Sequence, residues 1–187
     1  MPVWIHKRRV MRRYDQSARA YDAQYREEQD AKIKVLMQGL SLKQSSVVLD
    51  AGCGTGLLFK HLTERAESIT GTDISKGLLR KARERAQPYC NTALIQADAD
   101  NMPFLNDTFD AVFAITLLQN MPNPKATLIE FNRVAKSTAL IVATGLRKRF
   151  SQEDFVNLLK QADLRVEALK LDEENREYIC ICKKMQR

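Results

Sequence analysis

The sequence has no apolar run close to the roughly 18 to 20 residues that a membrane-spanning helix needs, so we expect no transmembrane segment. Its first ten residues also lack an apolar stretch of about 7 to 15 residues after their positive charges, which argues against a secretory signal. Both absences favour a cytoplasmic protein that does not associate with a membrane.

Cysteine pairs with metal-ligand spacing are absent as well. The four cysteines, Cys53, Cys90, Cys180 and Cys182, include no Cys-x-x-Cys pair. A chain of 187 residues can bury a core large enough to fold without disulfides. We therefore expect free thiols and no metal site.

The charge is distributed unevenly along the chain. Against 23 acidic residues there are 30 Lys and Arg, which gives a net charge of +7. One basic cluster lies within residues 7–13 and a second comprises Arg147, Lys148 and Arg149. Such clusters are typical of a surface that binds nucleic acid, and also of a solvated surface on a basic protein.

Short runs of β-branched and apolar residues predict five strands followed by a terminal hairpin. We expect the strands at 47–49, 69–72, 92–96, 109–116 and 138–143, and the hairpin at 164–171 and 177–182. Helical periodicity indicates one or two helices within 17–40 and a helix after the glycines of 52–56. Three more helices are expected after the N-cap candidates Ser75, Asn123 and Ser151.

This order predicts an α/β protein, a three-layer sandwich. The sheet is expected to be Rossmann-like, seven-stranded and mostly parallel, with a C-terminal antiparallel hairpin strand. Residues 1–44 form a basic N-terminal arm and helical cap, and residues 45–187 form the core of what we expect to be a single domain.

The most informative segment joins the first strand to the next helix. Asp50 stands two residues before Gly52, the first of three glycines with Gly54 and Gly56, which let the backbone turn tightly beside a ligand. A carboxylate at this point would repel a pyrophosphate but would suit an ammonium group.

Two further acids follow later strands. Asp73 comes 23 residues after Asp50, where a carboxylate can accept both hydroxyls of a ribose. Asp98 could accept the exocyclic amine of an adenine, with Ile74 and Ala99 lining the ring. The three acids together fit a nucleoside that carries an amino-acid tail.

These segments resemble successive motifs of class I S-adenosylmethionine-dependent methyltransferases, quinone-methylase-like branch. The matching stretches are Val48 to Gly56, Gly71 to Ser75, Asp98 to Phe104 and Phe109 to Val112. The resemblance implies an enzyme with S-adenosylmethionine as cofactor. It also implies a cofactor site made of Asp50, Ala51, Gly52, Cys53, Gly54, Gly56, Asp73, Ile74, Asp98, Ala99, Thr116 and Leu117. Tyr21 joins this site through a resemblance of Tyr14-Asp15 and Tyr21-Asp22 to the N-terminal helix that closes over the cofactor in this branch.

The acceptor of the methyl group is harder to infer. The segment Leu118 to Pro124 differs from the Asn-Pro-Pro-aromatic signature of nitrogen-methylating relatives and resembles the quinone-methylase-like form. Amides are poor bases, so no catalytic residue is assigned. Candidate substrate contacts are Gln119, Asn120, Tyr14, Arg147, Lys148 and Arg149.

The connection from Thr144 to Phe150 is too short to hold the lid that many small-molecule methyltransferases carry there. An open face beside two basic clusters favours transfer RNA or ribosomal RNA as the acceptor. The alternatives are a quinone-like or other small metabolite, a protein, or a non-catalytic subunit that binds the cofactor. A small activator subunit could also pair with an exposed sheet edge.

Overall fold

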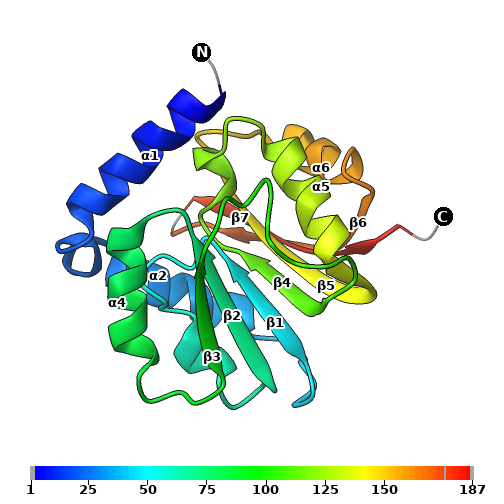
Figure 1. Ribbon diagram of the computed structural model, residues 1–187. Coiled ribbons are helices and arrows are strands. Elements are labelled where there is room, and N and C mark those ends of the chain that lie inside the picture. The colour runs from blue at the N-terminus through cyan, green and yellow to red at the C-terminus, as the bar shows by residue number, and fades with distance from the viewer. Residues whose placement is uncertain (1–2, 175, 186–187) are drawn as a thin grey trace.

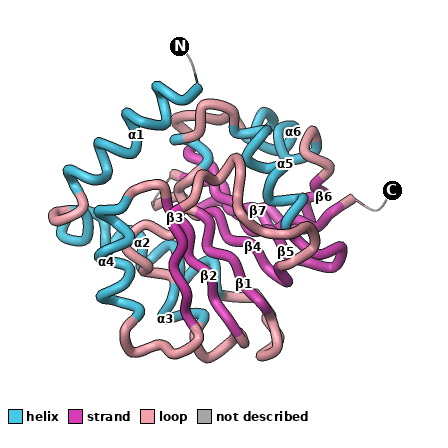
Figure 2. Tube along the Cα trace, in the orientation of Figure 1, coloured by secondary structure: helices cyan, strands magenta, loops and turns pink. Residues whose placement is uncertain are grey.

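A computed structural model describes residues 3–174 and 176–185. A seven-stranded sheet runs through the middle of the described chain, with helices on both faces (Figures 1 and 2). The strands are β1 (Val47–Ala51), β2 (Ser68–Asp73), β3 (Thr92–Gln96), β4 (Phe109–Ala114), β5 (Ala135–Leu146), β6 (Leu164–Asp172) and β7 (Glu177–Lys184). The α-helices are α1 (Val3–Ser17), α2 (Tyr21–Met37), α3 (Phe59–Leu62), α4 (Lys76–Ala86), α5 (Pro124–Val134) and α6 (Gln152–Lys160).

The strands lie in the order β3-β2-β1-β4-β5-β7-β6. The first five strands of the chain pair in parallel, whereas β7 is antiparallel to both β5 and β6. The expected three-layer α/β sandwich with a mostly parallel sheet and a C-terminal antiparallel hairpin is therefore confirmed. The chain progresses outward from β1 to β3 and then returns to β4 beside β1, which makes β1 and β4 the point where the strand order reverses.

Local capping chemistry starts three of the helices where the sequence predicts. The Ser75 side chain accepts a hydrogen bond from the backbone N–H of Leu78 at 3.1 Å. Asn123 caps α5 in the same way, and Ser151 caps α6. Side-chain oxygens thus satisfy amide groups that have no partner within the helix.

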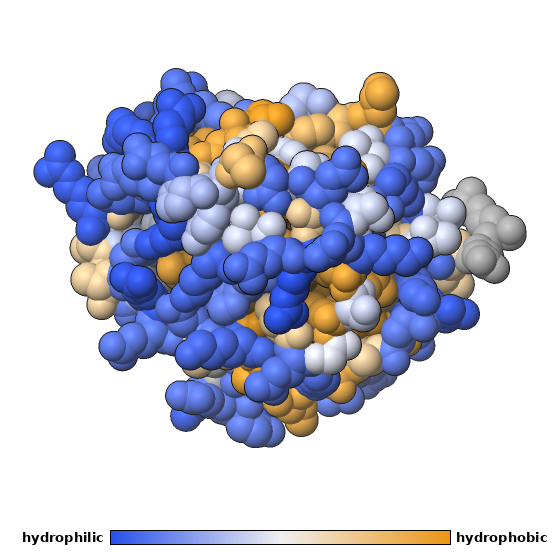
Figure 3. All heavy atoms as spheres, turned by 90° about the horizontal axis from the view of Figure 1, so that it is seen from below, coloured by the Kyte–Doolittle hydropathy of each residue, from blue (hydrophilic) through white to orange (hydrophobic). Residues whose placement is uncertain are grey.

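Two clusters of buried apolar residues hold the helices against the two faces of the sheet. On one face of the sheet, α5 and α6 bury Phe131 and Phe155. On the other face, α2, α3 and α4 bury residues such as Ile33, Phe59 and Ala82. Seen from below, the surface is covered mostly by hydrophilic residues, with apolar residues confined to patches (Figure 3). In the described ranges no helix is long and apolar enough to cross a bilayer.

The structure differs from the predicted elements in several places. The arm before residue 17 is helical, as α1. The helix after the glycine loop is only the four residues of α3. Gly54 and Gly56, which precede it, adopt φ values of 57° and 78°, so the loop itself cannot be helical. Residues 97–108 form no helix, so β3 passes to β4 through a loop.

The fourth strand is also shorter than expected. It ends at Ala114, so Thr116 follows the strand rather than ending it. Thr116 has a φ of 56°, which is incompatible with extended backbone. In the polar linker of the C-terminal hairpin, Asn175 lies outside the described residues.

Candidate functional site

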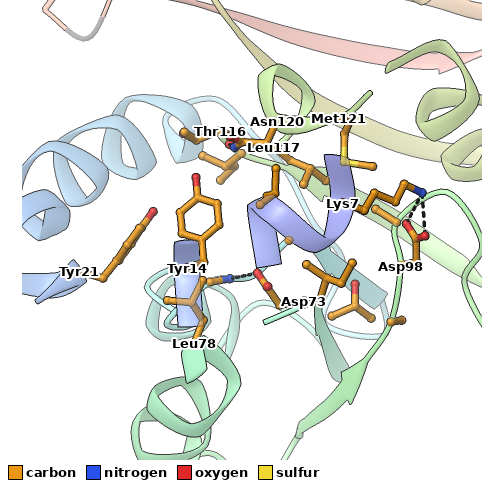
Figure 4. Close-up of a pocket in the computed structure, with 18 residues that line it drawn as sticks. Lys7, Tyr14, Tyr21, Asp73, Leu78, Asp98, Thr116, Leu117, Asn120 and Met121 are labelled. Carbon is orange, nitrogen blue, oxygen red and sulfur yellow. Dashed lines mark hydrogen bonds and ion pairs between the residues drawn. The ribbon is translucent and has the colours of Figure 1, made fainter. Parts of the chain in front are cut away.

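A pocket opens where the strand order reverses, at the carboxyl ends of β1, β2 and β4 (Figure 4). Sites in open α/β sheets characteristically occur at such a point. The pocket brings together eleven of the residues singled out from the sequence. They are Gly52, Gly54, Asp73, Ile74, Asp98, Ala99, Thr116, Leu117, Tyr14, Tyr21 and Asn120.

A second, smaller pocket lies on the α2 side of the glycine loop. It is lined by Asp50 and Cys53, and it shares Tyr21, Gly52 and Gly54 with the main pocket. The two hollows thus share residues of the glycine loop.

The glycine loop is held open by backbone geometry. Cys53 N–H donates to the carbonyl of Thr72 at 2.8 Å, and Gly54 N–H donates to Asp73 Oδ2 at 3.0 Å. A side chain built at Gly54 would meet no atom within 4 Å, because it would project into the pocket. The loop is thus a cradle whose space exists only because residue 54 has no side chain.

Of the two acids at the loop, Asp50 is buried and Asp73 is half-buried. Burial and the charge of Asp73 raise the pKa of Asp50 to about 8. Burial also raises the pKa of Asp73 to about 6, although backbone N–H groups of Ser75 and Gly54 oppose the shift. Ionising these carboxylates away from water costs free energy. A cationic or hydroxyl-bearing ligand would reduce that cost, because it would replace the lost hydration of the carboxylates.

Helix α1 lies across the main pocket and is fastened at both ends. At its N-terminal end, Lys7 Nζ lies 2.7 Å from Asp98 Oδ2 and 2.5 Å from Asp100 Oδ2. Burial lowers the pKa of Lys7, but the hydrogen bonds to Asp100 and Asp98 outweigh it and raise that pKa above its ordinary value. At the other end, Asp15 Oδ1 accepts hydrogen bonds from Ser75 Oγ at 2.7 Å and Gly77 N–H at 2.8 Å.

Two further side chains of α1 reach the loop that follows β4. His6 Nε2 lies 3.1 Å from the Asn120 carbonyl oxygen, and Arg13 donates to Asn120 Oδ1 at 2.9 Å. The Arg13 guanidinium also lies over the Tyr14 ring, 4.7 Å from its centroid. A positively charged helix therefore borders the pocket mouth.

Several residues singled out from the sequence do not line either pocket. Ala51 is fully buried within β1, and Gly56 packs against the ring of Phe59. The acceptor candidates Gln119, Arg147, Lys148 and Arg149 also lie outside both linings. Arg147 is in addition paired with Glu173 at 2.7 Å.

Sequence reasoning missed seven residues of the main pocket. Lys7 and Val10 lie on the same face of α1 as Tyr14, and the others are Thr72, Leu78, Ala97, Ile115 and Met121. The spacing 7, 10, 14 is helical and could have indicated this face. The density of positive charge in residues 7–13 favoured a basic arm instead.

Comparison with known proteins gives the family. The model of the methyltransferase domain family matches residues 49–143, more than half of the chain. A malonyl-[acyl-carrier protein] O-methyltransferase of a Marinomonas species is 32% identical over 143 residues, which cover 75% of this chain and 53% of that protein. A demethylmenaquinone methyltransferase of Staphylococcus saprophyticus is 32% identical over 112 residues, which cover 58% of this chain and 48% of that protein. The chain thus spans about half the length of these curated relatives.

Solved structures share the fold over nearly their full length. A methyltransferase of Haloferax volcanii, in complex with a methyltransferase activator, superposes with a TM-score of 0.84 at 16% identity and covers 92% of this chain and 98% of that one. For a SAM-dependent methyltransferase of Aquifex aeolicus the TM-score is 0.78 at 19% identity. The match covers 90% of this chain and 97% of that one. The chain belongs to the methyltransferase domain family and has the fold of class I S-adenosylmethionine-dependent methyltransferases, as its motifs indicate.

Proposed function

We propose that the protein is an S-adenosylmethionine-dependent methyltransferase. The observation that carries the proposal is the pair of acids, buried Asp50 and half-buried Asp73, beside a glycine loop that leaves room for a ligand. The cofactor has an ammonium group for one acid and two ribose hydroxyls for the other. Family membership and the fold support the same activity.

The remaining pocket residues fit the other parts of the cofactor. Asp98 would accept from the adenine amine, and Ile74 and Ala99 would contact the ring. Thr116 and Leu117 would contact the methionine end, which Tyr21 covers from α2. Lys7 Nζ, which lines the same pocket, donates to both oxygens of the Asp98 carboxylate.

The chain's own task is to place an acceptor and exclude water. Bound S-adenosylmethionine supplies a methyl group that its sulfonium has already activated. Tyr14 and Val10 of α1 shield the pocket from solvent, while Leu117 and Met121 give it an apolar wall. Alignment of the acceptor within such a closed space supplies most of what the transfer requires.

Calorimetric titration with S-adenosylhomocysteine tests the cofactor site. We expect micromolar binding in the intact protein and at least a tenfold loss in Asp73→Ala, because its carboxylate loses the ribose contacts. Glu84→Ala, which removes an exposed carboxylate from α4, is the control and should bind normally. The absence of heat with the intact protein would disprove the proposal.

We further propose RNA, transfer or ribosomal, as the acceptor. Support comes from the exposed arginines of α1, of which Arg8, Arg9 and Arg12 line one shallow groove. This groove lies on the helix that borders the pocket, so phosphates bound there would bring a base close to it. Lys148 and Arg149 are exposed after β5, at the same carboxyl edge of the sheet.

A small apolar metabolite is the second candidate. The wall formed by Val10, Ile115, Leu117 and Met121 suits a flat apolar acceptor, and α1 covers the pocket. A demethylmenaquinone methyltransferase is among the relatives.

Labelled cofactor offered to separated pools of RNA, protein and small molecules decides between these acceptors. RNA is supported if its labelling falls with salt and falls in a variant with Arg8, Arg9 and Arg12 changed to Gln. The matched control changes Lys76, Arg80 and Arg83 of α4 to Gln and should keep its activity. Labelling confined to the small-molecule or protein pool would replace RNA as acceptor. Cofactor binding without transfer to any pool would indicate a non-catalytic subunit.

We also propose that a small activator subunit pairs with the β3 edge. Within the described residues, β3 has β2 on one side and no strand on the other. Unpaired backbone groups at such an edge can accept a strand from another chain. An isolated chain that elutes as a monomer on size-exclusion chromatography and is fully active would contradict the need for such a subunit.

A further inference from the structure

A fully buried ion pair lies behind the pocket, between the N-terminal and C-terminal parts of the chain. Lys32 of α2 and Glu177 of β7 have side chains that are 0% and 1% exposed, and Lys32 Nζ lies 3.0 Å from Glu177 Oε1. Glu28, half-exposed on α2, lies farther away at 3.6 Å. Burial raises the pKa of Glu177 despite the partner, which shows how costly its desolvation is.

The ion pair is connected to the pocket through Thr116. Lys32 Nζ donates to Thr116 Oγ1 at 3.0 Å, and this hydroxyl donates in turn to Gln29 Oε1 at 3.4 Å. On the opposite side, the N–H of Thr116 donates to Thr144 Oγ1 at 2.8 Å. Asn120 Nδ2 donates to the Thr116 carbonyl at 3.1 Å. Every polar atom of Thr116 therefore has a partner within the protein.

Thr116 needs this support because its backbone is strained. Its φ of 56° is rare for a β-branched residue and persists only where the surroundings impose it. The strained residue turns the chain from β4 into the short 3₁₀ helix at Leu118–Asn120. Thr116, Leu117, Asn120 and Met121 then form one side of the pocket (Figure 4).

Stability alone does not account for this arrangement. A buried ion pair can usually be replaced by apolar side chains of similar volume without loss of stability. A strained threonine could likewise be replaced by glycine, which adopts a positive φ freely. The chain instead combines a costly ion pair with a strained residue at the edge of its ligand pocket.

We propose that the Lys32–Glu177 ion pair positions Thr116, and with it the pocket wall of residues 116–121, against the methionine end of the cofactor. Lys32 is thus a positioning residue that acts through the Thr116 hydroxyl, and α2 contributes to the geometry of the site as well as to the core. The inference rests on the proposed function, because it takes the pocket to be the cofactor site.

A double variant separates positioning from stability. In Lys32→Met/Glu177→Met both buried charges are removed at similar volume. We expect a melting temperature equal to or above that of the unchanged protein, but about tenfold weaker binding of S-adenosylhomocysteine by calorimetry. Unchanged affinity in a double variant that is at least as stable as the unchanged protein would overturn the proposal, because the ion pair would then have only a structural role.

A second pair of variants leaves the ion pair in place. Thr116→Val removes the hydroxyl that Lys32 holds, and Thr116→Ser keeps it. Binding should weaken about tenfold in the first and stay within about twofold in the second. Equal affinity of the two variants would contradict the inference even if the double variant failed to fold. If the unchanged protein does not bind S-adenosylhomocysteine, the proposed function itself fails.

Discussion

Asp50 shows how a residue proposed to bind a ligand can lower the stability of the fold. Its carboxyl group is buried, and burial with the nearby charge of Asp73 raises its pKa to about 8. In an unfolded chain the same group would titrate near pH 4. Between these two pH values the folded protein holds a proton that the unfolded chain releases, so this group reduces stability as the pH rises from about 4 to 8.

Asp50→Asn should remove that dependence. We expect the free energy of unfolding of the unchanged protein to fall between pH 5 and pH 8, relative to the variant, by on the order of a few kcal/mol. Urea unfolding of both proteins at the two pH values measures this. Cofactor binding should weaken in the variant, because an amide lacks the charge that attracts an ammonium group. Parallel stability profiles would show that Asp50 is already ionised without ligand.

Two glycines of the same loop should respond differently to alanine. At Gly56 a Cβ atom would collide with the ring of Phe59, which is fully buried, so Gly56→Ala should lower stability by about 2 to 4 kcal/mol. At Gly54 the Cβ atom would enter open space. Gly54→Ala should therefore cost only about 1 kcal/mol of stability yet strongly weaken cofactor binding.

Thermal unfolding and calorimetric titration of the two glycine variants distinguish these effects. The expected pattern is a large drop in melting temperature for Gly56→Ala and a large drop in affinity for Gly54→Ala. The reverse pattern would mean that the loop adopts another conformation in solution.

At the scale of elements, predictions succeeded where local chemistry decides the structure. The strands are short apolar runs, and Ser75, Asn123 and Ser151 each provide the cap for the helix that follows. The main pocket could be anticipated in large part, because parallel strands place their carboxyl ends together and Asp73 and Asp98 follow two of them.

The sequence did not predict those conformations that depend on contacts with residues far away in the chain. Helix α1 is stabilised by contacts to Asp98, Asn120 and the start of α4, which no local pattern reveals. The left-handed conformation of Thr116 likewise depends on Lys32 and Thr144, residues from two other elements. Tertiary contacts at these places determine the conformation.

Helix α1 should loosen when its N-terminal ion pairs are removed. Lys7→Met eliminates the contacts to Asp98 and Asp100, so we expect α1 to detach more often and the cofactor to dissociate several-fold faster. Trypsin should then cleave after the arginines of α1 more rapidly, as followed by mass spectrometry. Lys81→Met on α4, where the ion pair is exposed, is the control. Unchanged cleavage and dissociation would mean that the contacts of Asp15 suffice to hold the helix.

For the whole molecule, the two N-terminal helices have different roles. Helix α2 buries Ile33, Leu36 and Met37 in the core beneath the sheet, whereas Lys7 is the buried side chain of α1. We therefore expect a chain that starts at residue 18 to unfold cooperatively, with cofactor affinity reduced. A chain that starts at residue 41 should expose this part of the core and fail to fold.

Circular dichroism during heating, together with binding of S-adenosylhomocysteine, tests both truncations. A folded chain from residue 41 onward would show that α2 is dispensable for the fold. Full affinity in the chain from residue 18 onward would show that α1 does not contribute to the cofactor site.

The position of α1 has an evolutionary consequence. The helix adds no strand to the sheet and only one buried side chain, yet it forms the outer wall of the pocket. Mutations on its pocket-facing side can therefore change which molecule is admitted while leaving the scaffold's folding intact. Under the proposed function, selection for a new acceptor can therefore act on α1 with little effect on the stability of the core.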